Sequence, residues 1–217
     1  VVFIAGAWLL KMPEKAADKQ LDDQEGDVPT REMIKKISFW KLFAFFTLLA
    51  AVGSAAIGFG KDYFMSVGLE EGAAVTVAGL LSIFNGLGRI VSGMAFDKLG
   101  LRKAQILTSA VAILSPALAL LAILLHAGWL GVIGLCLCGF TYGFSPTMSA
   151  ALVAAFYGNK YFPLNFPVLN LVLIPASFSS TLAGALVTAS GSYLSTFVVL
   201  TVLSVVGLAV NLSIKKA

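Results

Sequence analysis

The sequence has little of the residues from which soluble enzymes build their sites: only 12% of its 217 residues are charged, and it holds one histidine and two cysteines. No cluster of histidine with carboxylates, or of serine, histidine and aspartate, falls inside the apolar stretches, so we expect no enzyme. Cys136 and Cys138 lie two residues apart in one predicted helix, where their side chains point in different directions. We expect them to be packing thiols, and we expect neither a metal nor a cofactor.

Apolar residues, by contrast, are abundant. They make up 59% of the chain, and the mean hydropathy is +0.93. This composition is typical of a membrane protein that crosses the bilayer several times, and it predicts an all-α fold. The net charge of +4 and the pI of about 9.1 would also suit a nucleic-acid binder, but the basic residues lie between apolar runs and form no patch with aromatic residues. We therefore expect a lipid bilayer, and no nucleic acid, as a partner.

The chain divides into three parts. Residues 1–10 are an apolar stub without an initial Met, about half the length that a span needs, and we interpret them as the end of a preceding transmembrane helix in a longer protein. Residues 11–41 mix both charge signs with two prolines, which predicts a solvated cytoplasmic linker. Residues 42–217 are the predicted transmembrane domain. Its six apolar runs, each long enough to cross a hydrocarbon core of about 30 Å, are residues 42–60, 72–96, 104–125, 131–157, 164–189 and 194–214.

The basic residues fall on one side of these six runs. The linker, the loop between the second and third runs, the loop between the fourth and fifth runs, and the C-terminus hold every Lys and Arg except Lys61 and Arg89. Lys61 stands in an opposite loop beside Asp62, Glu70 and Glu71. Because cytoplasmic loops carry the excess of Lys and Arg, we expect the linker and the C-terminus in the cytoplasm and the domain in the plasma membrane.

Arg89 is the one charged residue inside an apolar run. A charge at this depth costs roughly 3 to more than 10 kcal/mol, so such a residue is a candidate functional site by default. All eleven carboxylates lie in loops or at membrane edges, so its partner must be a ligand, water, backbone or a group elsewhere in a longer protein. Helical spacing places Ser82, Asn85, Ser92 and Gly93 on its face, as a stripe that would line a water-accessible path. A planar guanidinium can grip a carboxylate through two parallel hydrogen bonds.

The fourth and fifth runs contain most of the residues that disturb a helix. The fourth has glycines and Pro146 in CGFTYGFSP, and the fifth has Pro167 and Pro175, with Pro163 directly before it. Proline inside a span bends the helix and leaves one backbone carbonyl without its hydrogen bond. Neighbouring protein or water must then donate to that carbonyl. Bent spans suit a cavity, although each of these residues taken alone is more simply a packing device.

A compact charged turn, GMAFDKLGLRK at residues 93–103, follows Arg89. An aspartate at the end of one helix can pair with basic side chains or cap the next helix, and such a cluster can act as a latch that holds one cytoplasmic closed state. The simpler alternative is a positive anchor with an incidental acid. The spacing of glycines, acid and bases resembles the loop signature of the major facilitator superfamily, with Leu101 interrupting the usual Gly-Arg step. The latch residues would be Gly93, Asp97, Lys98, Gly100, Arg102 and Lys103.

Two further stretches narrow the resemblance. NGLGR at residues 85–89, and YGNKYFPLNF at residues 157–166 followed by Gly-Ser-Tyr at residues 191–193, resemble the second half of oxalate/formate antiporter-type carriers, a monocarboxylate-transporter-like branch of that superfamily. The resemblance covers nearly the whole chain. It implies a six-helix half of a twelve-helix fold, with an N-terminal six-helix half outside this sequence and a central substrate site between the two halves.

The resemblance also implies substrate-binding residues. Arg89 matches the arginine that binds substrate carboxylate in the eighth family helix, and Asn85 lies one turn before it. Oxalate carriers place a lysine in the eleventh helix, where this sequence has Asn170, which either bonds substrate or satisfies backbone freed by the nearby prolines. Phe140 and Phe144 either wall the site or pack in the bundle. A single cationic centre suits a monocarboxylate better than oxalate.

Together these features predict a secondary active transporter of small organic anions, carboxylates such as formate, oxalate, lactate or pyruvate. It would work by alternating access, with either exchange or proton coupling. The alternative is a carrier-like membrane sensor or scaffold, which would bind such an anion without counterflow.

Overall fold

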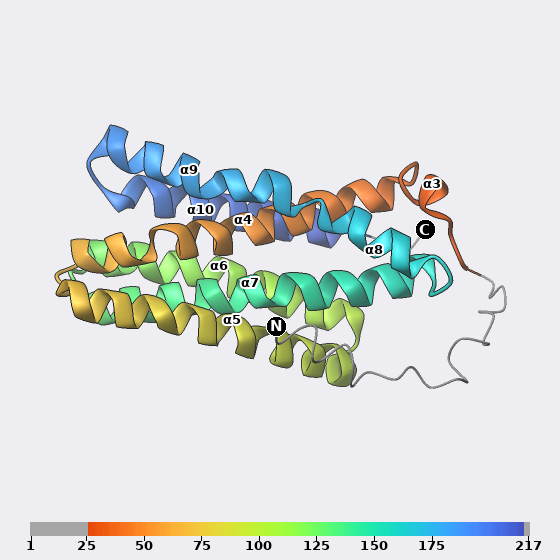
Figure 1. The fold of residues 1–217 in the computed structure, drawn as a ribbon, viewed down its shortest axis with the longest axis horizontal. Coiled ribbons are helices and arrows are strands. Elements are labelled where there is room, and N and C mark those ends of the chain that lie inside the picture. The colour runs from red at the N-terminus through yellow and green to blue at the C-terminus, as the bar shows by residue number, and fades with distance from the viewer. Residues whose placement is uncertain (1–25, 215–217) are drawn as a thin grey trace, which may run out of the picture.

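The computed structural model describes residues 26–214, which fold almost entirely into helices (Figure 1). The predicted end of a preceding helix, residues 1–10, and residues 11–25 of the predicted linker lie outside the described residues. The helices in chain order are α3 (Thr30–Met33), α4 (Ile37–Ser66), α5 (Glu71–Leu99), α6 (Leu101–Leu124), α7 (Gly128–Tyr157), α8 (Phe162–Asn170), α9 (Leu173–Ser190) and α10 (Tyr193–Ser213).

Six stretches of the described chain are long and apolar enough to cross a membrane, with α8 and α9 together counting as one stretch. The prediction of an all-α, six-span bundle is therefore confirmed. The helices extend past the apolar runs, since α4 begins at Ile37 and includes the last five residues of the predicted linker. A helix continues as long as its backbone hydrogen bonds do, so α4 includes Lys41 and Lys61 although neither is apolar.

The fifth predicted span consists of two helices. The chain leaves α8 after Asn170 and enters α9 at Leu173. Pro167 and Pro175 each lack the N–H that a continuous helix would use. The amides of Leu171 and Val172 donate to carbonyls three residues back, at 3.3 and 3.2 Å, which is a tighter turn than that of an α-helix. The expected bend is thus a break, whereas α6 and α7 continue through their internal prolines.

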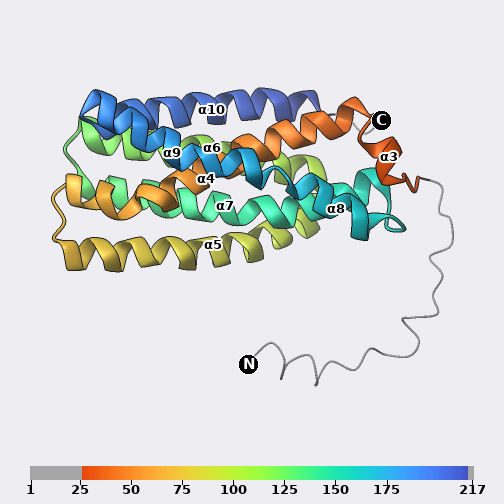
Figure 2. The same ribbon diagram turned by 45° about the horizontal axis from the view of Figure 1, so that its top comes forward.

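The central helices of the bundle are α4 and α7. In the most apolar stretch of each, 61% and 56% of the residues are buried, against 17% in both α5 and the α8–α9 span. In the two views of Figures 1 and 2, α5 lies at one edge and α9 toward the other, with α4 and α7 between them. Large faces of α5 and α9 are therefore not covered by the described part of the chain.

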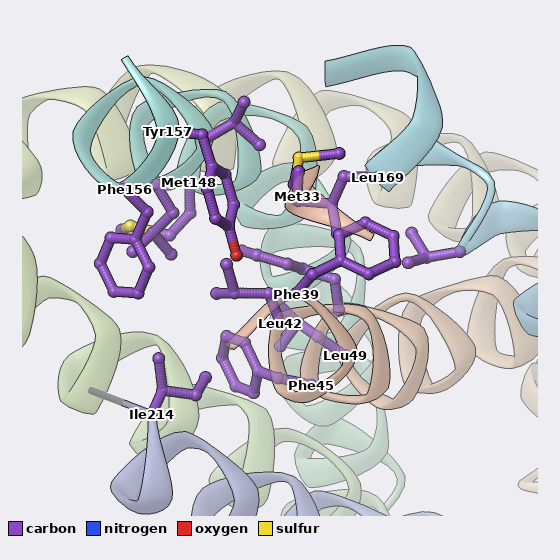
Figure 3. Packing of buried hydrophobic residues seen from close by; sticks show 14 of the residues in the cluster. Met33, Phe39, Leu42, Phe45, Leu49, Met148, Phe156, Tyr157, Leu169 and Ile214 are labelled. Carbon is purple, nitrogen blue, oxygen red and sulfur yellow. The ribbon is translucent and has the colours of Figure 1, made fainter. Parts of the chain in front are cut away.

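One end of the bundle gathers α3, the α5–α6 turn, the α7–α8 turn and the end of α10, and we call it the basic end. Its core contains residues from all these regions, including Met33, Phe39, Tyr157, Leu169 and Ile214 (Figure 3). Met33 is completely buried, which makes the end of the predicted linker part of the domain core.

A second core lies toward the opposite end. Phe197 packs there against Phe59 and Tyr63, with ring centroids 5.7 and 5.0 Å apart. Cys136 and Cys138 are buried and free, so the prediction of packing thiols is confirmed.

Candidate functional site

The seam between α5 and α7 brings two backbones into direct contact. Gly88 of α5 lies against the carbonyl of Phe140, and Gly143 of α7 lies against the carbonyl of Asn85. A Cβ added at Gly139 would lie 2.6 Å from the carbonyl oxygen of Leu81. Small residues allow transmembrane helices to approach this closely. The seam holds α5 rigidly on α7 at the level of Arg89.

Arg89 projects from this seam at the middle of α5. Its side chain is exposed, and within residues 26–214 no acidic side chain pairs with it. Its backbone is held from both sides, because its carbonyl accepts a hydrogen bond from Ser92 Oγ at 2.9 Å and one from Thr147 Oγ1 at 3.5 Å. About ten residues, or about 15 Å of helix, separate it from the end of α5 at Leu99. The backbone of Arg89 is thus fixed, and its guanidinium has no acidic partner among the described residues.

Asn85 lies one turn before Arg89 and is half-buried. Its side-chain Oδ1 is buried and has no hydrogen-bond partner among the described residues. Ser82 is exposed on the same side of α5. Ser92 differs from the expectation, because it is 1% exposed and its hydroxyl turns back to the Arg89 carbonyl. The polar stripe therefore runs over Ser82, Asn85 and Arg89. Ser92 lies about 60° around the helix axis from Arg89 and faces into the bundle.

The two candidate aromatic residues have different surroundings. Their ring centroids lie 4.8 Å apart with the planes at 58°. Phe144 is 1% exposed, so its ring packs inside the bundle. Phe140 is half-buried, and its carbonyl contacts Gly88, the neighbour of Arg89. The structure thus brings Arg89, Asn85 and Phe140 together across the seam.

Asn170 lies on another side of the bundle. It is the last residue of α8 and is half-buried. In the described part of the chain, α8 packs on α7, α3 and α4, whereas α5 packs on α7, α4 and α6. Figures 1 and 2 show α7 between α5 and the α8–α9 break. Asn170 is therefore not in direct contact with Arg89, and only a ligand or another segment would connect the two.

The charged turn separates α5 from α6. Gly100 has φ 76° and ψ 167°, a backbone conformation that residues with a Cβ rarely adopt. Arg102 donates hydrogen bonds to the carbonyls of Asn211 at 2.9 Å and Leu212 at 3.0 Å, so it caps the end of α10. Asp97, Lys98 and Lys103 are exposed, and within the described ranges none of them makes an ion pair.

The remaining turn residue is Gly93. A Cβ added there would meet only Thr147 Cγ2, at 3.9 Å. The position therefore has open space on the described half. In this conformation Arg102 anchors the turn, and the other charges of the turn face outward.

The end of the linker forms a strap, defined here as residues 27–38, over the α7–α8 turn. The Val28 N–H donates to the Tyr157 carbonyl at 2.9 Å, and Asn165 Nδ2 donates to the Val28 carbonyl at 2.9 Å. Thr30 Oγ1 donates to Asn165 Oδ1 at 2.7 Å, and the hydroxyls of Tyr157 and Ser38 lie 3.1 Å apart. The Lys160 N–H also donates to Asp27 Oδ1 at 3.2 Å, so three residues of YGNKYFPLNF hold the strap. Sequence reasoning missed this role, and its only local signal is an asparagine in an apolar stretch.

The described residues hold six stretches long and apolar enough to cross a membrane, which is the architecture of an integral membrane protein. Residues 1–166 match the sequence model of the Major Facilitator Superfamily, and the chain belongs to that superfamily. The chain is also similar to an uncharacterized MFS-type transporter, YhjX, of Escherichia coli strain K12, with 26% identity over 173 residues. That alignment covers 79% of this chain and 42% of the relative, so the chain spans less than half the length of the curated relative that it matches.

Proposed function

We propose that the full-length protein containing this chain is a secondary active transporter of small organic anions. Superfamily membership supports a carrier. The observation that supports the anion is Arg89, a permanently charged side chain at membrane depth without an acidic partner in the described residues. A lone cation in such a place is retained when a ligand neutralises it. The substrate class is carboxylates such as formate, lactate, pyruvate or oxalate.

The site chemistry follows from the residues around Arg89. The guanidinium binds the two carboxylate oxygens through parallel hydrogen bonds. The amide of Asn85, one turn away, offers an additional hydrogen-bond donor. The exposed part of Phe140 gives the carbon skeleton an apolar contact. One cation matches one carboxylate, so this half favours a monocarboxylate over oxalate.

Transport proceeds by alternating access between this domain and an N-terminal six-helix half. The half that pairs with this domain covers the exposed faces of α5 and α9. A bound anion neutralises Arg89 and allows the site to close, whereas an empty site leaves an unpaired charge that resists closure. This asymmetry favours exchange. The basic end faces the cytoplasm, and the protein resides in the plasma membrane.

The charged turn serves as the latch of this cycle. Arg102 ties the turn to α10, which leaves Asp97, Lys98 and Lys103 free to contact the other half. Gly93, the first residue of the latch set, allows that half a close approach, since a Cβ there would have only one neighbour among the described residues, at 3.9 Å.

The test is counterflow by the full-length protein in proteoliposomes loaded with formate or lactate. Arg89→Gln should abolish uptake of the labelled anion. Lys61→Gln, which removes an exposed charge near Glu71 at the other end of α4, should leave uptake close to wild type. Normal uptake by Arg89→Gln at normal expression would overturn the proposal. Wild-type binding of the anion without any counterflow would instead identify a carrier-like sensor.

A further inference from the structure

An exposed apolar ridge lies where the strap joins α4. Ile34, Ile37 and Trp40 are exposed by 40%, 69% and 54%. Ile37 and Trp40 are three residues apart in the first turn of α4 and share a face of the helix. Ile34 precedes the helix and is held beside them by a hydrogen bond from Trp40. Large apolar side chains in a row at a helix entrance need a partner that removes them from water.

The ridge is held in place by contacts with its neighbours. Trp40 Nε1 donates to the Ile34 carbonyl at 3.0 Å, which ties the two ends of the ridge together. The ring of Phe39 packs edge-on against Trp40 with centroids 5.3 Å apart. Met33, directly before the ridge, is completely buried in the core. The ridge residues therefore remain on the surface while their neighbours anchor the backbone.

Basic side chains surround the ridge. Arg31, Lys35, Lys36 and Lys41 lie within seven residues of it in sequence, and Glu32 is the one acid among them. Glu32 pairs with Lys35 at 2.8 Å, which leaves a clear positive excess. Lys41 Nζ donates to the Ser213 carbonyl at 2.9 Å, so the end of α10 lies beside the same surface.

We propose that this surface, residues 31–41, binds anionic phospholipids at the membrane edge. The location fits, because Ile37 is the first residue of a helix long and apolar enough to cross the bilayer. Tryptophan and aliphatic side chains enter the interface between headgroups and acyl chains. Basic side chains next to them bind the phosphate groups of an anionic leaflet. A free phosphate ion would bind only the basic side chains and leave the apolar ridge in water. A neutral lipid would cover the ridge but would not neutralise the excess of basic side chains.

Lipid binding would also support the strap. Thr30, one residue before Arg31, donates to Asn165 of α8. Headgroups that hold residues 31–41 at the membrane edge thus help to keep the strap on the α7–α8 turn. The domain should therefore become more stable when anionic lipid is bound, as ligand linkage requires.

The experiment measures the thermal stability of the purified full-length protein in detergent during titration with phosphatidylglycerol or phosphatidylcholine. Phosphatidylglycerol should stabilise the wild type at far lower concentration than phosphatidylcholine. Arg31→Gln combined with Lys36→Gln leaves the Lys35–Glu32 pair intact. This variant should need about thirtyfold more phosphatidylglycerol for the same stabilisation, since each basic residue near an anionic surface contributes about fivefold in affinity. Trp40→Ala should weaken the response to both lipids.

The matched control is Lys98→Gln combined with Lys103→Gln. It removes the same charge from the same end of the bundle, beside Asp97 and without a tryptophan, and it should keep most of the lipid response. Equal stabilisation by the two lipids, an equal loss in the control pair, or the same stabilisation by inorganic phosphate would each overturn the proposal. The readout is independent of transport, so its outcome does not depend on the proposed substrate.

Discussion

The seam between α5 and α7 makes a specific prediction about Gly143. In Gly143→Ala, the new Cβ would lie 3.1 Å from the backbone nitrogen of Arg89 and directly against the backbone carbonyl of Asn85. Ordinary contacts need about 3.5 Å or more, so α5 must move from α7 by about 1 Å. Such overpacking costs about 1–3 kcal/mol of stability. A shift of about 1 Å at a binding group can reduce turnover by about a hundredfold.

The matched control is Gly79→Ala on the same helix. Nothing in the described chain lies within 4 Å of a Cβ at Gly79, and alanine is favoured over glycine in a helix by about 0.5–1 kcal/mol. Thermal unfolding and counterflow of the two full-length variants should therefore diverge, with Gly143→Ala less stable and nearly inactive. Equal stability and equal counterflow in both variants would refute the seam as the element that positions Arg89.

Two further predictions concern the basic end. Asn165→Ala removes two hydrogen bonds and leaves the carbonyl of the half-buried Val28 without its donor, so it should lower the free energy of unfolding by about 2 kcal/mol and speed proteolysis of the strap. Thr30→Val should cost about half as much, and unchanged proteolysis in both variants would contradict the role of the strap. Arg102→Gln should destabilise the end of α10 by about 1 kcal/mol, seen as faster hydrogen exchange at residues 211–214 with little change in α9.

The sequence was sufficient for the parts of the fold that composition and local pattern decide. Six apolar runs predicted six spans, because each crosses the bilayer on its own backbone hydrogen bonds. Pro167 and Pro175 indicated the irregular span, since a missing N–H acts locally. Arg89 could be identified because a charge is rare in such a chain.

Contacts between distant turns could not be predicted in this way. Arg102 bonds to a carbonyl 109 residues away, and Thr30 bonds to Asn165 across 135 residues. Neither pair leaves a periodic signal, because each depends on how the helices pack. The same limit explains Ser92, whose helical spacing suggested the face of Arg89 but whose burial depends on the approach of α7. It also explains Asn170, which helical spacing alone could not place relative to α5.

The most direct test of the account is equilibrium binding of formate or lactate to the purified full-length protein, measured by isothermal titration calorimetry. The account predicts binding by the wild type and by Lys61→Gln. Arg89→Lys, which keeps the charge but loses the planar fork, should bind more weakly. Arg89→Gln should bind at least about thirtyfold more weakly than the wild type, since a paired, desolvated charge is lost. Undiminished binding by a folded Arg89→Gln variant would contradict the assignment of Arg89 as the carboxylate-binding residue.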